Sequence, residues 1–123
     1  MCGITACVAT DDVADTLLAG LRNLEYRGYD SAGVATQNGD GVTVVKREGG
    51  IDELAAKLDG ADPSGRVGVG HTRWSTHGAP TDANAHPHTD CAGRVAVVHN
   101  GIIENYADLR SELAARGHEL TSD

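Results

Sequence analysis

The sequence predicts an α+β fold, because segments with strand character and segments with helical spacing follow one another along a short chain. Residues 3–9 form an apolar run typical of a buried strand, and residues 10–28 change to helical spacing. Residues 31–47 contain two β-rich runs around an Asn38-Gly39 turn signal, which predicts an antiparallel hairpin. The length of 123 residues suits one domain that includes the whole chain.

The helix over residues 10–28 has one apolar face and recognisable ends. The apolar residues at helical spacing are Val13, Leu17, Leu21 and Leu24. Thr10 or Asp11 can cap the first amides, and Gly28 can end the helix. We therefore expect a helix with one buried face.

The remaining elements follow from the same patterns. They are a helix over residues 51–58, a loop over 60–65, strands over 67–73 and 95–100, and a helix over 105–117. In the last helix Asn105 is the expected cap, Gly117 the expected end, and Leu109 and Leu113 are expected to face inward. Residues 118–123 resemble a strand cut short, so we expect the chain to be the leading part of a longer fold.

Composition and charge argue against some classes of binding partner. The 18 acidic residues outnumber the 10 basic residues, and the formal charge of −8 disfavours nucleic acid and anionic membranes. No apolar run is long enough for a membrane helix, and no secretory signal is present, so we expect a cytoplasmic protein. The three cysteines, Cys2, Cys7 and Cys91, form no disulfide pattern and are expected to be reduced.

Cys2 directly follows the initiator methionine. Removal of Met1, which the small size of Cys2 permits, would free the α-amino group of Cys2. Such a group has a pKa of about 8, so part of it is unprotonated at neutral pH and can accept the thiol proton. One residue would then supply both nucleophile and base. The alternative is an inert buried cysteine in the first strand.

Asn100-Gly101 and Arg73 could bind a substrate. An Asn side-chain amide beside a backbone amide can form an oxyanion hole, although Asn-Gly is also the commonest hairpin turn signal. Arg73 leaves a strand end and can bind a carboxylate through two parallel hydrogen bonds. The alternative for Arg73 is a surface ion pair with one of the many acids.

Residues 74–93 lack a periodic pattern and predict a long polar loop, which is usually functional or disordered. Histidines are frequent in and around this loop, and they are His71, His77, His86, His88 and His99. His86-x-His88 suggests metal binding as a rival hypothesis, although no H-E-x-x-H motif or cysteine-paired spacing accompanies it.

Five motifs occur in a fixed order: "MCGI", "LEYRGYDSAG", "GHTRWSTHG", "NAHPH" and "VVHNGIIEN". Together they resemble the glutaminase domain of the glutamine–fructose-6-phosphate aminotransferases, within the class II glutamine amidotransferases. The resemblance covers nearly the whole chain and implies the N-terminal-nucleophile (αββα) fold, two stacked antiparallel sheets between helical layers, here only its leading part. Amidophosphoribosyltransferases, another branch, typically have Tyr at the Trp74 position and a "NAQPF"-like stretch.

The resemblance implies that mature Cys2 attacks the side-chain amide of L-glutamine, while Asn100 and Gly101 hold the oxyanion. Ammonia leaves, and water hydrolyses the resulting thioester to glutamate. The implied substrate-binding residues are Arg73 for the α-carboxylate, Thr76 and His77 in the pocket, and Trp74 in a closing segment. The implied supporting residues are His86 and Arg27.

We expect no cofactor and no metal. As partners the resemblance implies L-glutamine, the remainder of the glutaminase domain, the sugar-isomerase domains and, in the complete enzyme, a homodimer. The Asp that binds the substrate α-amino group in the family is expected just beyond Asp123, which is not its equivalent. Two alternatives stay open: a non-catalytic segment that binds the remainder of its fold, and an amidophosphoribosyltransferase-type glutaminase.

Overall fold

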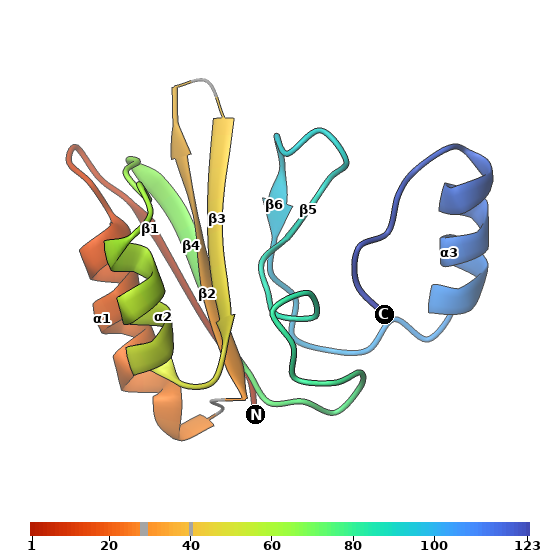
Figure 1. The fold of residues 1–123 in the computed structure, drawn as a ribbon, viewed down its shortest axis with the longest axis horizontal. Helices are drawn as coiled ribbons and strands as arrows, with labels where there is room; N and C mark the ends of the chain where they lie inside the picture. Colours follow the sequence, from red (N-terminus) through yellow and green to blue (C-terminus); the bar gives the residue numbers. More distant parts are fainter. Residues whose placement is uncertain (28–29, 40) are drawn as a thin grey trace.

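A four-stranded antiparallel sheet forms the centre of the computed structural model, which describes residues 1–27, 30–39 and 41–123 (Figure 1). The strands are β1 (Gly3–Val8), β2 (Ser31–Asn38), β3 (Gly41–Glu48), β4 (Val67–Arg73), β5 (His88–Thr89) and β6 (Ala96–Val97). The helices are α1 (Ala14–Leu24), α2 (Ile51–Asp59) and α3 (Tyr106–Ala115), with a 3-10 turn η1 at Glu25–Arg27. The predicted α+β class is confirmed.

The strand order β1-β4-β2-β3 determines which strand ends lie next to one another. Gly3 lies opposite Thr72, and Ser31 lies opposite Arg73, in antiparallel register. The start of β1, the end of β4 and the start of β2 therefore lie at one end of the sheet. This end carries Cys2, directly before β1, beside Arg73.

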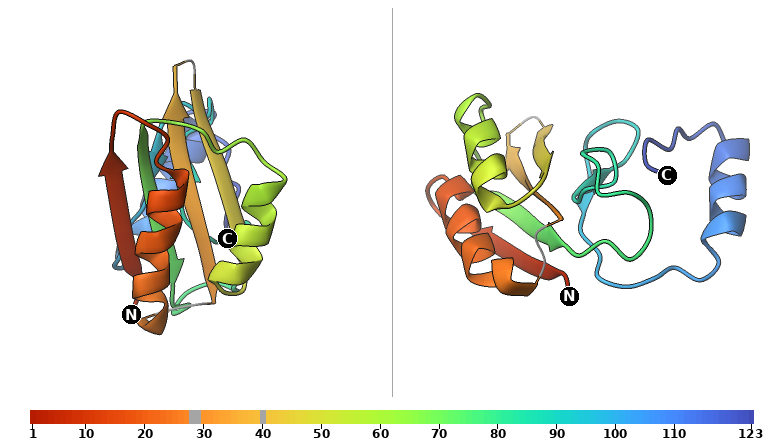
Figure 2. Two further views of the ribbon diagram at one scale, coloured as in Figure 1. Left: turned by 90° about the vertical axis from the view of Figure 1, so that its left-hand side faces the viewer. Right: turned by 60° about the horizontal axis from the view of Figure 1, so that its bottom comes forward.

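The main core lies between the sheet and the two helices that cover one of its faces, α1 and α2 (Figure 2, left). Its completely buried apolar residues are Val13, Leu17, Leu21, Ala32, Val34, Ile51 and Leu54. The predicted apolar face of the first helix is therefore confirmed, with Leu24 half-buried at its end. The predicted hairpin is confirmed as β2 and β3.

Residues that follow β4 return across the other face of the sheet and include β5 and β6, which pair as a second antiparallel sheet (Figure 1). At Gly33 in β2, a Cβ atom would collide with the backbone carbonyl oxygen of His86, so only glycine allows this approach. Lys46 in β3 fixes the same segment, since its ammonium donates to the carbonyls of Ala83 at 3.2 Å and Ala85 at 2.8 Å. The predicted polar loop is thus anchored to the sheet.

Two predictions about helix caps need correction. The first amide of α1, that of Ala14, donates to Asp12 Oδ1 at 2.9 Å, so neither Thr10 nor Asp11 is the cap. Asn105 occupies the cap position of α3, but its side chain forms no capping hydrogen bond. The predicted end of α1 at Gly28 lies outside the described residues.

Predictions for the last third of the chain were partly wrong. Only Ala96–Val97 of the expected strand over 95–100 is a strand, and residues 118–123 form none. The residues Leu109 and Leu113 are 39% and 37% exposed rather than directed inward. The physical reason is that α3 lies apart from the four-stranded sheet, so its apolar side chains meet no sheet face (Figures 1 and 2).

Within the described ranges, the helices are all too short or too polar to cross a lipid bilayer.

Candidate functional site

The sheet register brings the predicted nucleophile to the end of β4. The backbone N–H of Trp74 donates to Cys2 Sγ at 3.3 Å, and the thiol lies 3.7 Å from the Trp74 carbonyl oxygen. Cys2 is half-buried, which leaves its sulfur partly accessible. The Trp74 N–H thus holds the Cys2 sulfur at the end of β4.

Asn100 lies beside Cys2, although the two residues are far apart in the sequence. The Asn100 side-chain Nδ2 donates to the backbone carbonyl of Cys2 at 3.2 Å. Asn100 Oδ1 lies 2.7 Å from Nε2 of His71, a buried residue of β4. The Asn100 amide is therefore held between β1 and β4, next to the residue that carries the thiol.

Gly101 follows in a backbone conformation that favours glycine, with φ of +143°. The chain then continues through a turn into α3, and no strand follows that could complete a hairpin within the described residues. The interpretation of Asn100-Gly101 as a hairpin turn is therefore wrong. Gly101 is exposed and directly follows Asn100, and the oxyanion hole formed by these two residues stays a prediction.

Arg73 is not a surface ion pair, because its residue is only 8% exposed. Its guanidinium donates to three carbonyls of the turn that follows β4: that of Ala79 at 3.0 Å, that of Gly78 at 3.5 Å, and that of His77. The turn is thereby wrapped around a buried positive charge. A carboxylate is the ligand that such a charge would attract at this end of the sheet.

Two residues that the sequence did not single out as functional hold this turn in place. Asp30 Oδ2 accepts the backbone N–H of Ser75 at 2.6 Å, and Asn84 Nδ2 donates to the Ala79 carbonyl at 3.1 Å. Asn84 also forms two hydrogen bonds with Asp123, one to its carboxylate at 3.0 Å and one from its backbone N–H at 2.9 Å. Asp30 lies in the motif "LEYRGYDSAG" and Asn84 in the motif "NAHPH". Membership of these motifs was the sequence feature that could have identified them.

The other predicted residues lie on the rim of this site. Trp74 is 47% exposed, and Thr76 and His77 are exposed as well. No direct contact joins Thr76 or the His77 side chain to Cys2 among the interactions of the described residues. The side chain of Arg27, predicted as a support, lies outside the described part of the structure, as do Gly28 and Tyr29 of the same motif.

The rings of His71, His86 and His88 lie next to one another and form a cluster, here called the histidine stack. His71 joins this cluster to Asn100. The ring centroids of His71 and His86 lie 4.4 Å apart and nearly parallel, and His88 meets His86 edge-on at 4.4 Å. Burial, followed by the nearby charges of His71, His88, Arg73 and Lys46, lowers the pKa of His86 to about 3. Burial, followed mainly by Lys46, lowers the pKa of His88 to about 4. The rings of this stack are therefore neutral at pH 7.

The metal-binding hypothesis finds no support in this stack. Where the chain is described, no group of three or more His, Cys, Asp or Glu side chains converges as metal ligands would. His86 instead uses Nδ1 to accept the backbone N–H of His99 at 3.3 Å, which ties the stack to the segment that carries Asn100.

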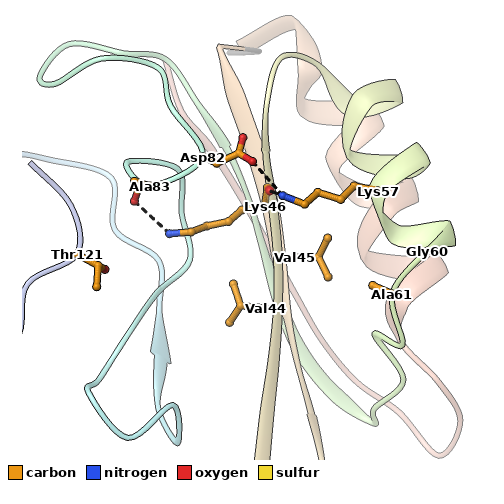
Figure 3. Close-up of a pocket in the computed structure, with 9 residues that line it drawn as sticks. All are labelled: Val44, Val45, Lys46, Lys57, Gly60, Ala61, Asp82, Ala83 and Thr121. Atoms are coloured by element: carbon orange, nitrogen blue, oxygen red, sulfur yellow. Dashed lines mark hydrogen bonds and ion pairs between the residues drawn. The ribbon is translucent and has the colours of Figure 1, made fainter.

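A hollow of about 580 Å³ lies elsewhere, between β3, α2 and the segment around Asp82 (Figure 3). It contains both lysines of the chain, and each ammonium donates to two acceptors within the protein. Lys57 Nζ donates to the Lys46 carbonyl at 2.8 Å and to Asp82 at 2.9 Å, while Lys46 points toward Ala83. The hollow is a structural junction and contains none of the predicted site residues.

Comparisons with known proteins agree with the geometry. The sequence profile described as "Glutamine amidotransferase domain" matches residues 47–123. Glutamine–fructose-6-phosphate aminotransferase [isomerizing] of Streptomyces coelicolor is 59% identical over 124 residues, which cover 100% of this chain and 20% of the relative. The enzyme of the same name from Pyrococcus horikoshii is 53% identical over 123 residues, with 21% of its length covered. The chain thus spans about one fifth of the length of these curated relatives.

Solved structures show the same fold. A glutamine phosphoribosylpyrophosphate amidotransferase from B. subtilis, complexed with ADP and GMP, superposes with a TM-score of 0.74 at 25% identity. That match covers 93% of this chain and 25% of the other. A structure described as the allosteric regulatory enzyme of purine biosynthesis superposes with a TM-score of 0.80 at 24% identity, covering 97% and 26%.

The predicted N-terminal-nucleophile fold is therefore confirmed, and the match to the family profile extends over most of the chain. The second sheet of the fold is represented here by the two short strands β5 and β6. The chain belongs to the glutamine amidotransferase domain family.

Proposed function

We propose that this chain hydrolyses L-glutamine to glutamate and ammonia through a thioester on Cys2. The observation that carries the proposal is the meeting of three groups at one end of the sheet. The Cys2 thiol accepts the Trp74 N–H at 3.3 Å, and the Asn100 amide contacts the Cys2 carbonyl at 3.2 Å. The proposed nucleophile and the proposed oxyanion donor thus lie next to each other, which acyl transfer would require.

The reaction would begin with transfer of the Cys2 thiol proton to the α-amino group that removal of Met1 exposes. The thiolate sulfur bonds to the side-chain amide carbon of glutamine, and the carbonyl electron pair moves onto oxygen. The amine returns its proton to the leaving nitrogen, the carbon–nitrogen bond breaks, and ammonia departs. Water then attacks the thioester, releasing glutamate and the thiol.

Asn100 and Gly101 would donate to the oxyanion of both tetrahedral intermediates. Loss of one such donor typically lowers kcat by about 10²- to 10³-fold. Arg73 would provide the positive charge for the substrate α-carboxylate, with Thr76 and His77 on the exposed rim, and Trp74 would belong to a segment that closes over the substrate and excludes water. His86 would support the site as part of the histidine stack, and we propose the same supporting role for Arg27.

We further propose that the ammonia serves conversion of fructose 6-phosphate to glucosamine 6-phosphate in amino sugar biosynthesis. The relatives named glutamine–fructose-6-phosphate aminotransferase are 53% and 59% identical, against 25% for the phosphoribosylpyrophosphate enzyme, so the sugar-phosphate branch is favoured. The sugar-isomerase part of those relatives would supply the acceptor site. The three cysteines without disulfides agree with a cytoplasmic location.

Glutaminase turnover in the natural protein that carries this chain tests the proposal. Cys2→Ala should abolish release of glutamate from glutamine, because it removes the thiol that would form the thioester. Cys91→Ala is the matched control, since this exposed thiol lies outside the site, and it should leave turnover unchanged. Full activity of Cys2→Ala would overturn the proposal.

A second variant tests the role of the α-amino group separately. An N-terminal extension that prevents removal of Met1 retains the Cys2 thiol but converts its amine to an amide, which has no basic nitrogen. Turnover should then fall to the level of Cys2→Ala. An extended protein with unchanged turnover would show that another base serves Cys2.

A further inference from the structure

We propose that His71 is a positioning residue, whose ring N–H holds the Asn100 side chain in the orientation that aims its amide at the reacting atoms. The proposal rests on the proposed glutaminase function and adds a residue to its machinery. It derives from one short contact, 2.7 Å between His71 Nε2 and Asn100 Oδ1.

The direction of this hydrogen bond follows from the second contact of the Asn100 amide. The backbone carbonyl of Cys2 can only accept, so the atom of Asn100 that lies 3.2 Å from it must be the donor Nδ2. Oδ1 therefore faces His71, and Nε2 of His71 must carry the hydrogen. The ring N–H of His71 and the carbonyl of Cys2 thus favour the same one of the two amide orientations that differ by a flip.

His71 is buried in a strand of the sheet, whereas Asn100 is exposed and lies outside regular structure. His71 lies in β4 between two paired strands and is completely buried, with its ring stacked on His86. Asn100 is exposed and lies in a segment without regular structure, three residues after β6 ends. A group that must present a donor to a transient oxyanion is effective only if its orientation is fixed beforehand. His71 is the buried partner that can fix it.

Burial and neighbouring positive charges keep the His71 ring neutral. Burial lowers the pKa of His71, the bond to Asn100 opposes this shift, and the charges of Arg73 and His99 add to the lowering. A neutral ring carries one hydrogen, and the contact with Asn100 places it on Nε2. His71 Nδ1 has no hydrogen-bond partner among the described residues, so no competing contact opposes this tautomer.

Four variants of the natural protein distinguish positioning from mere packing. His71→Leu removes the donor and keeps a buried side chain of similar size, whereas His71→Gln places an amide donor near the Nε2 position. Asn100→Ala removes the oriented group. The double variant His71→Leu/Asn100→Ala completes a double-mutant cycle with the two single variants. Val34→Ala, on the opposite face of β2, controls for loss of stability without a change in the site.

We expect His71→Leu to lower kcat by about 10- to 100-fold, the range found when the partner that orients a metal ligand is removed. KM for glutamine should change little, because the lost interaction acts on the transition state. His71→Gln should restore most of kcat. In the Asn100→Ala background His71→Leu should have almost no further effect, since its effect passes through the missing amide.

Additive losses in the double variant would overturn the proposal, as would an equal loss in Val34→Ala or a kcat unchanged in His71→Leu. The rate of Cys2 alkylation by iodoacetamide should stay close to that of the parent in each His71 variant, which shows that the nucleophile is still folded and accessible. Failure of the proposed function is recognised separately, by a parent protein that lacks turnover or by a Cys2→Ala variant that retains it.

Discussion

Acidification from pH 7 to pH 5 should destabilise the fold through the histidine stack. Burial and neighbouring positive charge lower the pKa of His86 to about 3 and that of His88 to about 4. In the unfolded chain both rings have a pKa of about 6.5 and become protonated over this interval. The unfolded state therefore binds more protons than the folded state, and stability falls as the pH falls.

The magnitude follows from these pKa values. Between pH 7 and pH 5 each ring loses about 1.9 kcal/mol of stabilisation by linkage, or about 4 kcal/mol for the pair. Both rings are half-buried, so water screens part of the effect, and a discount of one half leaves about 2 kcal/mol. His71, whose pKa burial also lowers, acts in the same direction.

Urea unfolding at pH 7, 6 and 5, followed by far-UV circular dichroism, measures this loss. The double variant His86→Gln/His88→Gln should lose distinctly less stability over the interval, because neither position can then bind a proton. Val34→Ala should be less stable than the parent by the same amount at each pH. A parent as stable at pH 5 as at pH 7, or a double variant with the full pH dependence, would refute the reasoning.

Three further predictions concern the packing that supports the site. Gly33→Ala should destabilise the fold by about 1–3 kcal/mol, because its Cβ would collide with the His86 carbonyl; an unchanged urea midpoint would contradict this contact. Leu21→Ala should lose about 2–5 kcal/mol, since Leu21 is completely buried between α1 and the sheet, and a loss below 1 kcal/mol would show that the core is misplaced. Lys46→Met should lower the free energy of unfolding by about 1–3 kcal/mol, because the Ala83 and Ala85 carbonyls lose their ammonium donor. Thermal unfolding measures this loss, and an unshifted Tm would contradict it.

Local sequence patterns predicted the elements whose packing is also local. The spacing of Val13, Leu17 and Leu21 determined the buried face of α1, because a helix that follows a buried strand can return directly onto it. The β-rich runs around Asn38-Gly39 predicted the hairpin for the same reason, since its two strands pair with each other.

The last helix shows where such patterns fail. Leu109 and Leu113 have helical spacing, and α3 does form, but spacing cannot supply the surface on which a helix packs. Within this chain α3 lies apart from the sheet, so the leucines stay partly exposed.

The residues of the candidate site could be predicted from the sequence, but the contacts between them could not. Cys2 and Asn100 could be named from their chemical types, and five ordered motifs gave them a shared context. The contact between His71 and Asn100 joins residues from β4 and from an irregular segment, and no periodic pattern encodes such a meeting. The carbonyls that surround Arg73 depend on turn conformations, which propensities do not determine.

Mass spectrometry of active protein treated with the glutamine analogue 6-diazo-5-oxo-norleucine tests whether Cys2, with a free α-amino group, is the nucleophile. We expect a chain that lacks Met1 and carries a single adduct, which peptide mapping places on Cys2. Active protein that retains Met1, or an adduct on Cys7 or Cys91 instead, would contradict it.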